Sequence, residues 1–127
     1  MFTKSFLILN ALIIGSVGVA YLIDPNLLLA RYGLETGSTG MDNMLRATYG
    51  GLYLACAAIF LLGVISAARQ RDSVAFVGIF MTGAAIGRMV SIVAAGSPPD
   101  SIMPLLYVEI VLAIIATALF MRSKPAS

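Results

Sequence analysis

The chain has 127 residues, of which 60% are hydrophobic and only 11% are charged, and its formal net charge is +2. This balance excludes an ordinary water-soluble domain, whose core cannot bury so much apolar surface, and the small net charge argues against a nucleic-acid partner. Histidine is absent and the single Cys56 cannot form an internal disulfide. We therefore expect no metal site, no cofactor and no thiol redox chemistry.

Four apolar segments are long enough to cross a bilayer, which takes about 20 mainly apolar residues per helix. They cover residues 6–23, 43–68, 73–95 and 102–121. The first segment resembles a secretory signal because Lys4 precedes it, but three further apolar segments favour a retained span. The sequence therefore predicts an all-α fold, with residues 1–127 forming a single bundle of four transmembrane helices.

A short helix is expected directly after the first span. Asp24 and Pro25 form an N-cap followed by proline at the first helical position, and Gly33 ends the helix that they start. Residues 26–32 carry three leucines beside Arg31, so this helix should lie along the membrane surface as an interfacial helix.

Polar residues mark the other helix ends. Asp42 is placed to cap the second span, and a charged turn at residues 69–72 joins it to the third. Asp100 or Ser101 can cap the last span, in which Pro104 falls in the first turn.

The basic residues are divided unequally between the two sides of this four-span arrangement. One side carries Lys4, Arg69, Arg71, Arg122 and Lys124. The opposite side carries Arg31 and Arg46 together with the acids Asp24, Glu35, Asp42 and Asp100. Because short cytoplasmic loops collect Lys and Arg, we expect a multi-pass protein of a cell inner membrane with both termini in the cytoplasm.

Small residues at helical spacing suggest where helices meet. The third span contains Gly83 and Gly87 four residues apart, and the second contains Ala47, Gly51 and Ala55. Such faces let backbones approach closely in lipid, so we expect both to pack inside the bundle.

Charged residues within the spans fall at one level. At 1.5 Å per residue, Arg88 lies about 10 Å below the outer boundary, Glu109 about 9 Å and Arg46 about 6 Å. An unpaired charge is costly in hydrocarbon, so Arg88 and Glu109 are expected to form an ion pair with Arg46 close by.

Tyrosines accompany this charged level. Tyr49 and Tyr53 share a helical face with Arg46, and Tyr107 precedes Glu109 by two residues. One interpretation is a polar pocket, open to the outer side, in which Arg46 and Arg88 hold an anionic or amphipathic ligand. The alternative is structural: the ion pair fixes two helices together, Arg46 reaches the headgroups, and the tyrosines belong to the interfacial belt.

The chain resembles an uncharacterised bacterial family of small four-helix integral membrane proteins, a domain of unknown function, and is faintly similar to DoxX-like proteins. The resemblance covers nearly the whole chain and is carried by Asp24-Pro25, Gly33, the run Arg46 to Leu52, Gly87-Arg88 and Glu109. It implies the four-span fold and the importance of Arg46, Arg88 and Glu109, and it supplies no activity.

Three classes of function are compatible with the sequence. The first is an accessory or scaffold subunit, or a bundle that binds a lipid or small amphipathic ligand; its partners would be membrane lipids and a larger membrane complex or a second copy. The second is a proton-coupled transporter resembling small multidrug exporters, although that family has its glutamate in the first helix and a tryptophan, which this chain lacks. An enzyme ranks last, because no nucleophile–base pair or metal motif supplies catalytic residues.

Overall fold

The computed structural model describes residues 1–123, which form helices and connecting segments without any strand. The helices are α1 (Phe2–Ile23), α2 (Asn26–Leu29), the 3₁₀ turn η1 (Ala30–Tyr32), α3 (Thr39–Leu45), the π-helical segment η2 (Arg46–Leu52), α4 (Tyr53–Ile65), the 3₁₀ turn η3 (Ala67–Arg69), α5 (Gln70–Ala95) and α6 (Met103–Arg122). The segments α3, η2 and α4 follow one another without a break and act as one long helix.

Four helical stretches are long and apolar enough to cross a membrane: Phe2–Ile23, Thr39–Ile65, Ala67–Ala95 and Met103–Arg122. Large apolar side chains, among them Ile65, Ile79 and Val93, lie exposed on these helices. Such surfaces suit lipid and would be a liability in water. The predicted all-α fold with four spans is therefore confirmed, and the chain is a multi-pass membrane protein.

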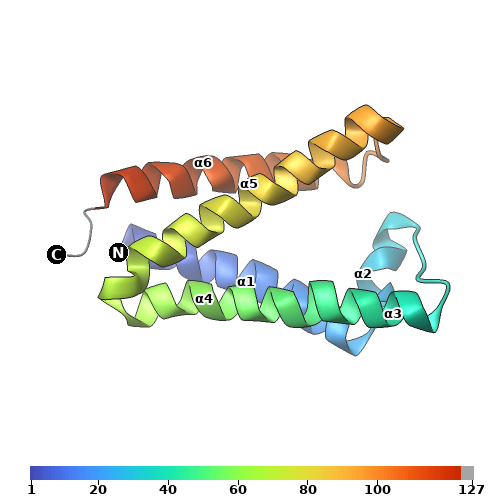
Figure 1. Cartoon of the computed structure of the whole chain (residues 1–127), viewed down its shortest axis with the longest axis horizontal. Coiled ribbons are helices and arrows are strands. Elements are labelled where there is room, and N and C mark those ends of the chain that lie inside the picture. Colours follow the sequence, from blue (N-terminus) through green and yellow to red (C-terminus); the bar gives the residue numbers. More distant parts are fainter. Residues whose placement is uncertain (124–127) are drawn as a thin grey trace.

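The four spans form two antiparallel hairpins, α1 with α4 and α5 with α6 (Figure 1). The start of α1, the α4–α5 connection and the end of α6 lie together at one end, which we call the terminal end. The opposite end carries α2, α3 and the α5–α6 loop, and we call it the loop end. From the terminal end α5 rises away from α4, so the hairpins diverge toward the loop end.

The two hairpins are joined where α5 begins. The Ser73 hydroxyl donates to the carbonyl oxygen of Ile59 at 2.7 Å, across the α4–α5 boundary. This close approach depends on Gly63, because a Cβ there would lie 2.5 Å from the Ser73 Cβ and 2.8 Å from a Leu7 methyl. A hydroxyl that bonds a backbone carbonyl is also a favoured contact between helices in lipid.

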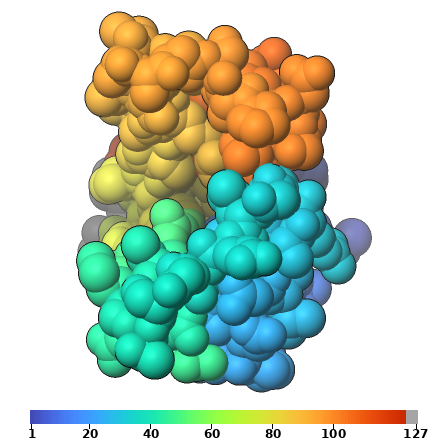
Figure 2. All heavy atoms as spheres, turned by 90° about the vertical axis from the view of Figure 1, so that its right-hand side faces the viewer, coloured from blue at the N-terminus to red at the C-terminus, as the bar shows by residue number. Residues whose placement is uncertain are grey.

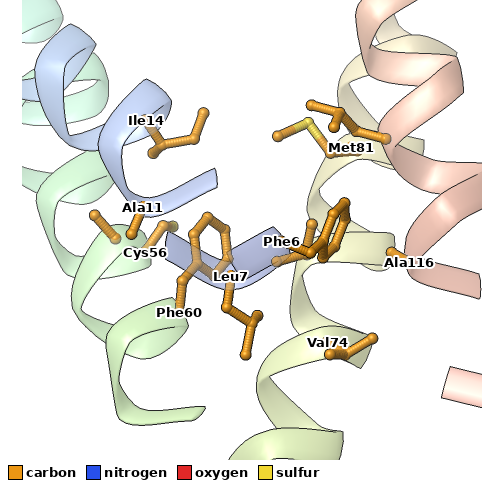
Figure 3. Packing of buried hydrophobic residues seen from close by; sticks show 12 residues of the cluster. Phe6, Leu7, Ala11, Ile14, Cys56, Phe60, Val74, Met81 and Ala116 are labelled. Atoms are coloured by element: carbon orange, nitrogen blue, oxygen red, sulfur yellow. The ribbon is translucent and has the colours of Figure 1, made fainter. Parts of the chain in front are cut away.

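The core beside this junction takes side chains from all four long helices (Figure 3). Leu7 of α1 and Phe60 of α4 are fully buried, and they meet Val74 of α5 and Ala116 of α6. The remaining buried members are Phe6, Ala11, Ile14, Cys56, Ala57, Val77, Met81 and Leu112. The tightest packing of the molecule therefore lies toward the terminal end.

A short helix follows the first span as expected, but its N-cap is Pro25 and not Asp24. An Asp24 carboxylate oxygen accepts from the Asn26 backbone N–H at 2.9 Å, and the chain turns with Gly33 at φ +70°. A left-handed residue closes a helix at low cost only when it is glycine, so Gly33 ends the segment there.

Two other expected caps are wrong. Ser38 is the N-cap of α3, because its hydroxyl accepts from a backbone N–H of the first turn at 3.2 Å, and Asp42 lies inside the helix instead. Ile102 precedes α6 without any side-chain cap, so neither Asp100 nor Ser101 has that role. Pro104 does lie in the first turn, where its missing N–H costs nothing.

The second and third spans also differ from the predicted bounds. The second begins at Thr39 and ends at Ile65, since Ser66 is extended, with φ −124° and ψ 114°. The charged stretch after it forms η3 and the first turn of α5, so α5 begins at Gln70. Hydropathy marks apolar residues and therefore misses polar residues that continue a helix beyond the apolar layer.

The expected packing through Gly51, Gly83 and Gly87 is wrong within the chain. A Cβ at Gly83 or Gly87 would meet nothing within 4 Å, because that part of α5 has left α4 and faces outward. At Gly51 a Cβ would meet only the helix's own backbone, whereas at Gly50 it would lie 2.6 Å from a Leu22 methyl. The glycine that packs against α1 is therefore Gly50, one residue earlier.

Replacing Gly63 with alanine should lower stability in detergent, whereas Gly83→Ala should not. Both changes gain the same intrinsic helix preference, and only the first forces a methyl into Ser73 and Leu7. Overpacking of this kind costs about 1–3 kcal/mol. Thermal unfolding of the two variants measures the difference, and equal midpoints would contradict the role assigned to Gly63.

Candidate functional site

The ion pair predicted from matched depth is present. Arg88 of α5 donates from Nε to both carboxylate oxygens of Glu109 of α6, at 2.9 and 2.8 Å. The side chain of Glu109 is only 13% exposed and that of Arg88 is 34% exposed. Each charge offsets the other, which lowers the free-energy cost of placing both charged side chains within the spans. The pair also fixes α5 to α6.

This pair lies in the wall of a cavity of about 180 Å³ between the two hairpins. Residues from α1, α2, η1, η2, α4, α5 and α6 surround it, so every part of the bundle except α3 and η3 contributes. The lining residues are Ile13, Ile14, Val17, Tyr21, Leu28, Tyr32, Tyr49, Tyr53, Phe80, Met81, Ala84, Arg88, Leu105, Val108, Glu109 and Leu112. The cavity thus has mostly apolar walls, four tyrosines and one ion pair.

An aromatic series forms one side of the cavity. The rings of Tyr21 and Tyr49 stack with centroids 5.1 Å apart, and Tyr49 meets Tyr53 at 5.2 Å with an edge-on geometry. Tyr53 in turn meets Phe80 of α5 edge-on at 5.4 Å. Offset and edge-on pairs are the favoured arrangements of aromatic rings, and this series connects α1, the second span and α5.

The short helix covers the cavity at the loop end. Leu28 of α2 and Tyr32 of η1 are both lining residues, so the segment turns back over the space between the hairpins. Figure 2 looks onto this end, and the cyan spheres of that segment lie directly below the orange spheres of the α5–α6 turn. The short helix α2 and the turn η1 therefore contribute a wall of the cavity.

Arg46 does not belong to this site, contrary to expectation. Its guanidinium donates to the carbonyl oxygens of Leu22 and Ile23, at 3.2 and 3.4 Å. These are among the last carbonyls of α1, which have no partner within their own helix and carry the negative end of its dipole. Arg46 therefore caps α1 from the second span.

The π-helical segment explains why Arg46 leaves the tyrosine face. An α-helix brings residues three, four and seven apart onto one face, which predicted Arg46, Tyr49 and Tyr53 together. A π turn closes on the fifth residue, so it takes more residues per turn and the α spacing no longer applies. Residues 46–52 form such a turn, and the two tyrosines face the cavity while Arg46 faces the end of α1.

Tyr107 is also misplaced by the sequence prediction. This residue is 60% exposed and does not line the cavity, so it faces the surroundings of the bundle. Tyr21 and Tyr32 were missed. Their position in the sequence could have indicated them, because both lie close to the connection that follows the first span. In addition, Tyr21 follows Ile14 by seven residues on the buried face of α1.

The charged members of the site have no additional ligands that would suggest a metal. Among residues 1–123, no three residues of the types His, Cys, Asp and Glu come together in a way that could hold a metal ion. The described lining residues offer a ligand hydrogen bonds, ring contacts and apolar contacts.

Removing one member of the ion pair should destabilise the bundle more than removing both. Arg88→Met leaves a carboxylate without its partner, Glu109→Met leaves a guanidinium, and the double variant leaves neither. We expect a coupling free energy of about 1–3 kcal/mol, lowered by the partial exposure of Arg88. Unfolding of the four proteins in mixed detergent micelles gives this value, and strictly additive effects would show that the pair has no energetic role.

Comparison with curated proteins and with solved structures finds no match. A family model described as a domain of unknown function, DUF4345, matches residues 2–120. This range includes the first three spans, the fourth as far as Phe120, the tyrosine-lined cavity and the Arg88–Glu109 pair. The chain therefore belongs to the DUF4345 family.

Proposed function

We propose that this protein binds a small amphipathic ligand within the membrane, in the cavity between its two hairpins. One observation carries the proposal: the Arg88–Glu109 pair lines an open space together with four tyrosines. Ligand sites are typically apolar hollows with a few convergent polar groups, and this cavity has that composition.

The cavity also favours binding over a purely structural pair. An ion pair that served only to join α5 to α6 would be best enclosed by packed side chains, which exclude competing partners. Here Arg88 remains one-third exposed, and both members of the pair face the cavity. The pair can therefore join α5 to α6 and still be available to a ligand in the cavity.

Tyrosine emission offers a direct test, because the chain has five tyrosines and no tryptophan. Four of the five line the cavity, and Tyr107 is the exception. β-Naphthol absorbs where tyrosine emits, so its binding in the cavity should quench the emission in a saturable manner. Ala84→Phe places a ring in the cavity and should abolish saturable quenching.

The matched control is Ala58→Phe, which adds the same ring to an exposed position of α4 outside the cavity. It should leave the quenching curve unchanged, as should Tyr107→Phe apart from a smaller total signal. Thermal unfolding confirms that each variant is folded. Equal quenching in Ala84→Phe and Ala58→Phe would mean that β-naphthol only partitions into the micelle, and the proposal would fail.

A second candidate function is that of an accessory subunit. It is favoured by a groove on the outer surface between α5 and α6, of about 540 Å³. Gly78 and Gly83 lie in this groove beside Thr82 and Thr117, so a partner helix could approach the backbone there. A membrane complex or a second copy of the chain would supply that helix. The transporter interpretation stays a prediction without a contact that favours it.

The proposal places the protein in a bacterial inner membrane with both termini in the cytoplasm. The membrane is suggested by the family resemblance and the orientation by charge. Lys4, Arg69, Arg71 and Arg122 belong to the segments at the terminal end, and Lys124 lies outside the described residues. Asp24, Glu35 and Asp100 belong to segments at the loop end, so the terminal end is the more basic one.

Cysteine labelling in intact cells tests the orientation. Cys56 is buried and is replaced by alanine, and single cysteines are introduced at Ser97 in the α5–α6 loop and at Ser66 in the α4–α5 connection. A membrane-impermeant maleimide should label the protein with Ser97→Cys and spare the one with Ser66→Cys. The reverse labelling pattern would show that the protein has the opposite orientation in the membrane.

A further inference from the structure

The Arg88 guanidinium has hydrogen-bond donors that the protein leaves unused. Its Nε donates to Glu109, whereas its two terminal amino groups make no hydrogen bond with any of residues 1–123. These terminal nitrogens are not fully buried, because the buried side-chain atoms without a hydrogen bond in the described residues do not include them. Arginine carries five donors and no acceptor, so four N–H groups remain.

Unsatisfied donors at this position need a partner from outside the chain. Hydrocarbon offers no acceptor, and a polar group without a hydrogen bond costs several kcal/mol there. Arg88 lines the tyrosine-lined cavity and also a second hollow of about 190 Å³ near the α5–α6 loop. An acceptor beside Arg88, the lining residue that the two hollows share, would meet the free amino groups.

The charge of the site selects the kind of acceptor. Arg88 and Glu109 are the charged residues among the described lining of the cavity, and their charges cancel. Arg46 binds the end of α1 and adds no positive charge here. Glu109 already offsets the charge of Arg88 at 2.8 Å and would repel a second anion nearby, so the site gives an anionic ligand no net attraction and an uncharged acceptor such as a carbonyl oxygen is favoured.

The two hollows differ in their walls. The tyrosine-lined cavity offers the rings of Tyr49 and Tyr53, which suit contact with an aromatic ring. Apart from Arg88, the second hollow is lined mainly by apolar side chains, namely Ile92, Pro98, Ile102, Met103 and Leu106 with Ser91. These suit a short alkyl chain.

We infer that the ligand of this site is an uncharged lipophile whose carbonyl oxygen lies between an aromatic ring and an alkyl chain. The carbonyl accepts from the terminal amino groups of Arg88, the ring contacts the tyrosines, and the alkyl chain enters the second hollow. Glu109 is then a positioning residue, because it holds the guanidinium through Nε and leaves its outer face free. The inference rests on the proposed function and names its ligand class.

Three tritium-labelled probes of nearly equal size test this inference by equilibrium binding to the detergent-extracted protein. Octanophenone carries the carbonyl between ring and chain, octylbenzene replaces it with a methylene, and para-heptylbenzoate is an anion. Octanophenone should bind on the order of tenfold more tightly than either of the others, as expected for a hydrogen bond to a charged donor.

The variant Arg88→Met/Glu109→Met removes the donors without leaving a charge behind. It should still bind octylbenzene, as the wild type does, and it should lose the preference for octanophenone. Ala84→Phe should lose all three probes, and Ala58→Phe should lose none.

The outcomes separate the two proposals. If no probe binds the wild type better than Ala84→Phe, the proposed function fails and the inference fails with it. If all three bind equally well, or if para-heptylbenzoate binds most tightly, the cavity function stands and the carbonyl inference is overturned. A preference for octanophenone that persists in Arg88→Met/Glu109→Met would also overturn it, since the selectivity would then come from elsewhere.

Discussion

The close approach of α5 to α4 at the terminal end is the constraint on which the rest of the structure depends. Gly63 has no side chain, so Ser73 can bond the α4 backbone at 2.7 Å and the two hairpins meet there. The core side chains gather beside this junction, and α5 then rises away from α4 (Figure 1). The cavity occupies part of the space that this divergence creates. A bulkier residue at position 63 would move the hairpins apart where they are joined, and the cavity would lose the fixed angle between its walls.

The sequence predicted the fold well because bilayer thickness leaves few alternatives for a strongly apolar chain. Four apolar runs give four spans, and short connections give an antiparallel order. Counting residues from the helix ends also placed Arg88 and Glu109 at one depth, and the structure brings them together. Depth along a helix follows from a fixed rise per residue, so it can be read from the sequence whenever the helix ends are known.

Rotation about the helix axis was much harder to predict, and most errors at the site come from it. Arg46 and Tyr107 were both assigned to the site, but the first caps α1 and the second faces outward. The π turn at residues 46–52 changes the rotation of everything before it, and its hydrogen bonds leave no clear signature in residue types. The same reason explains why Gly50, and not Gly51, contacts α1. Small residues show that a close approach is possible, whereas the divergence of the hairpins decides whether it occurs.

The Arg46 cap has a consequence for how the protein enters its membrane. Helices are delivered to the bilayer in the order of synthesis, and an arginine inside a span adds a cost of a few kcal/mol to that step. Arg46 finds its acceptors on α1, the span made just before it, and Arg88 finds Glu109 on α6, the span made just after. Each charge is therefore satisfied within a single helical hairpin. The chain can insert as two hairpins, in each of which the arginine within the span already has an acceptor, and the cavity forms only when the finished hairpins come together.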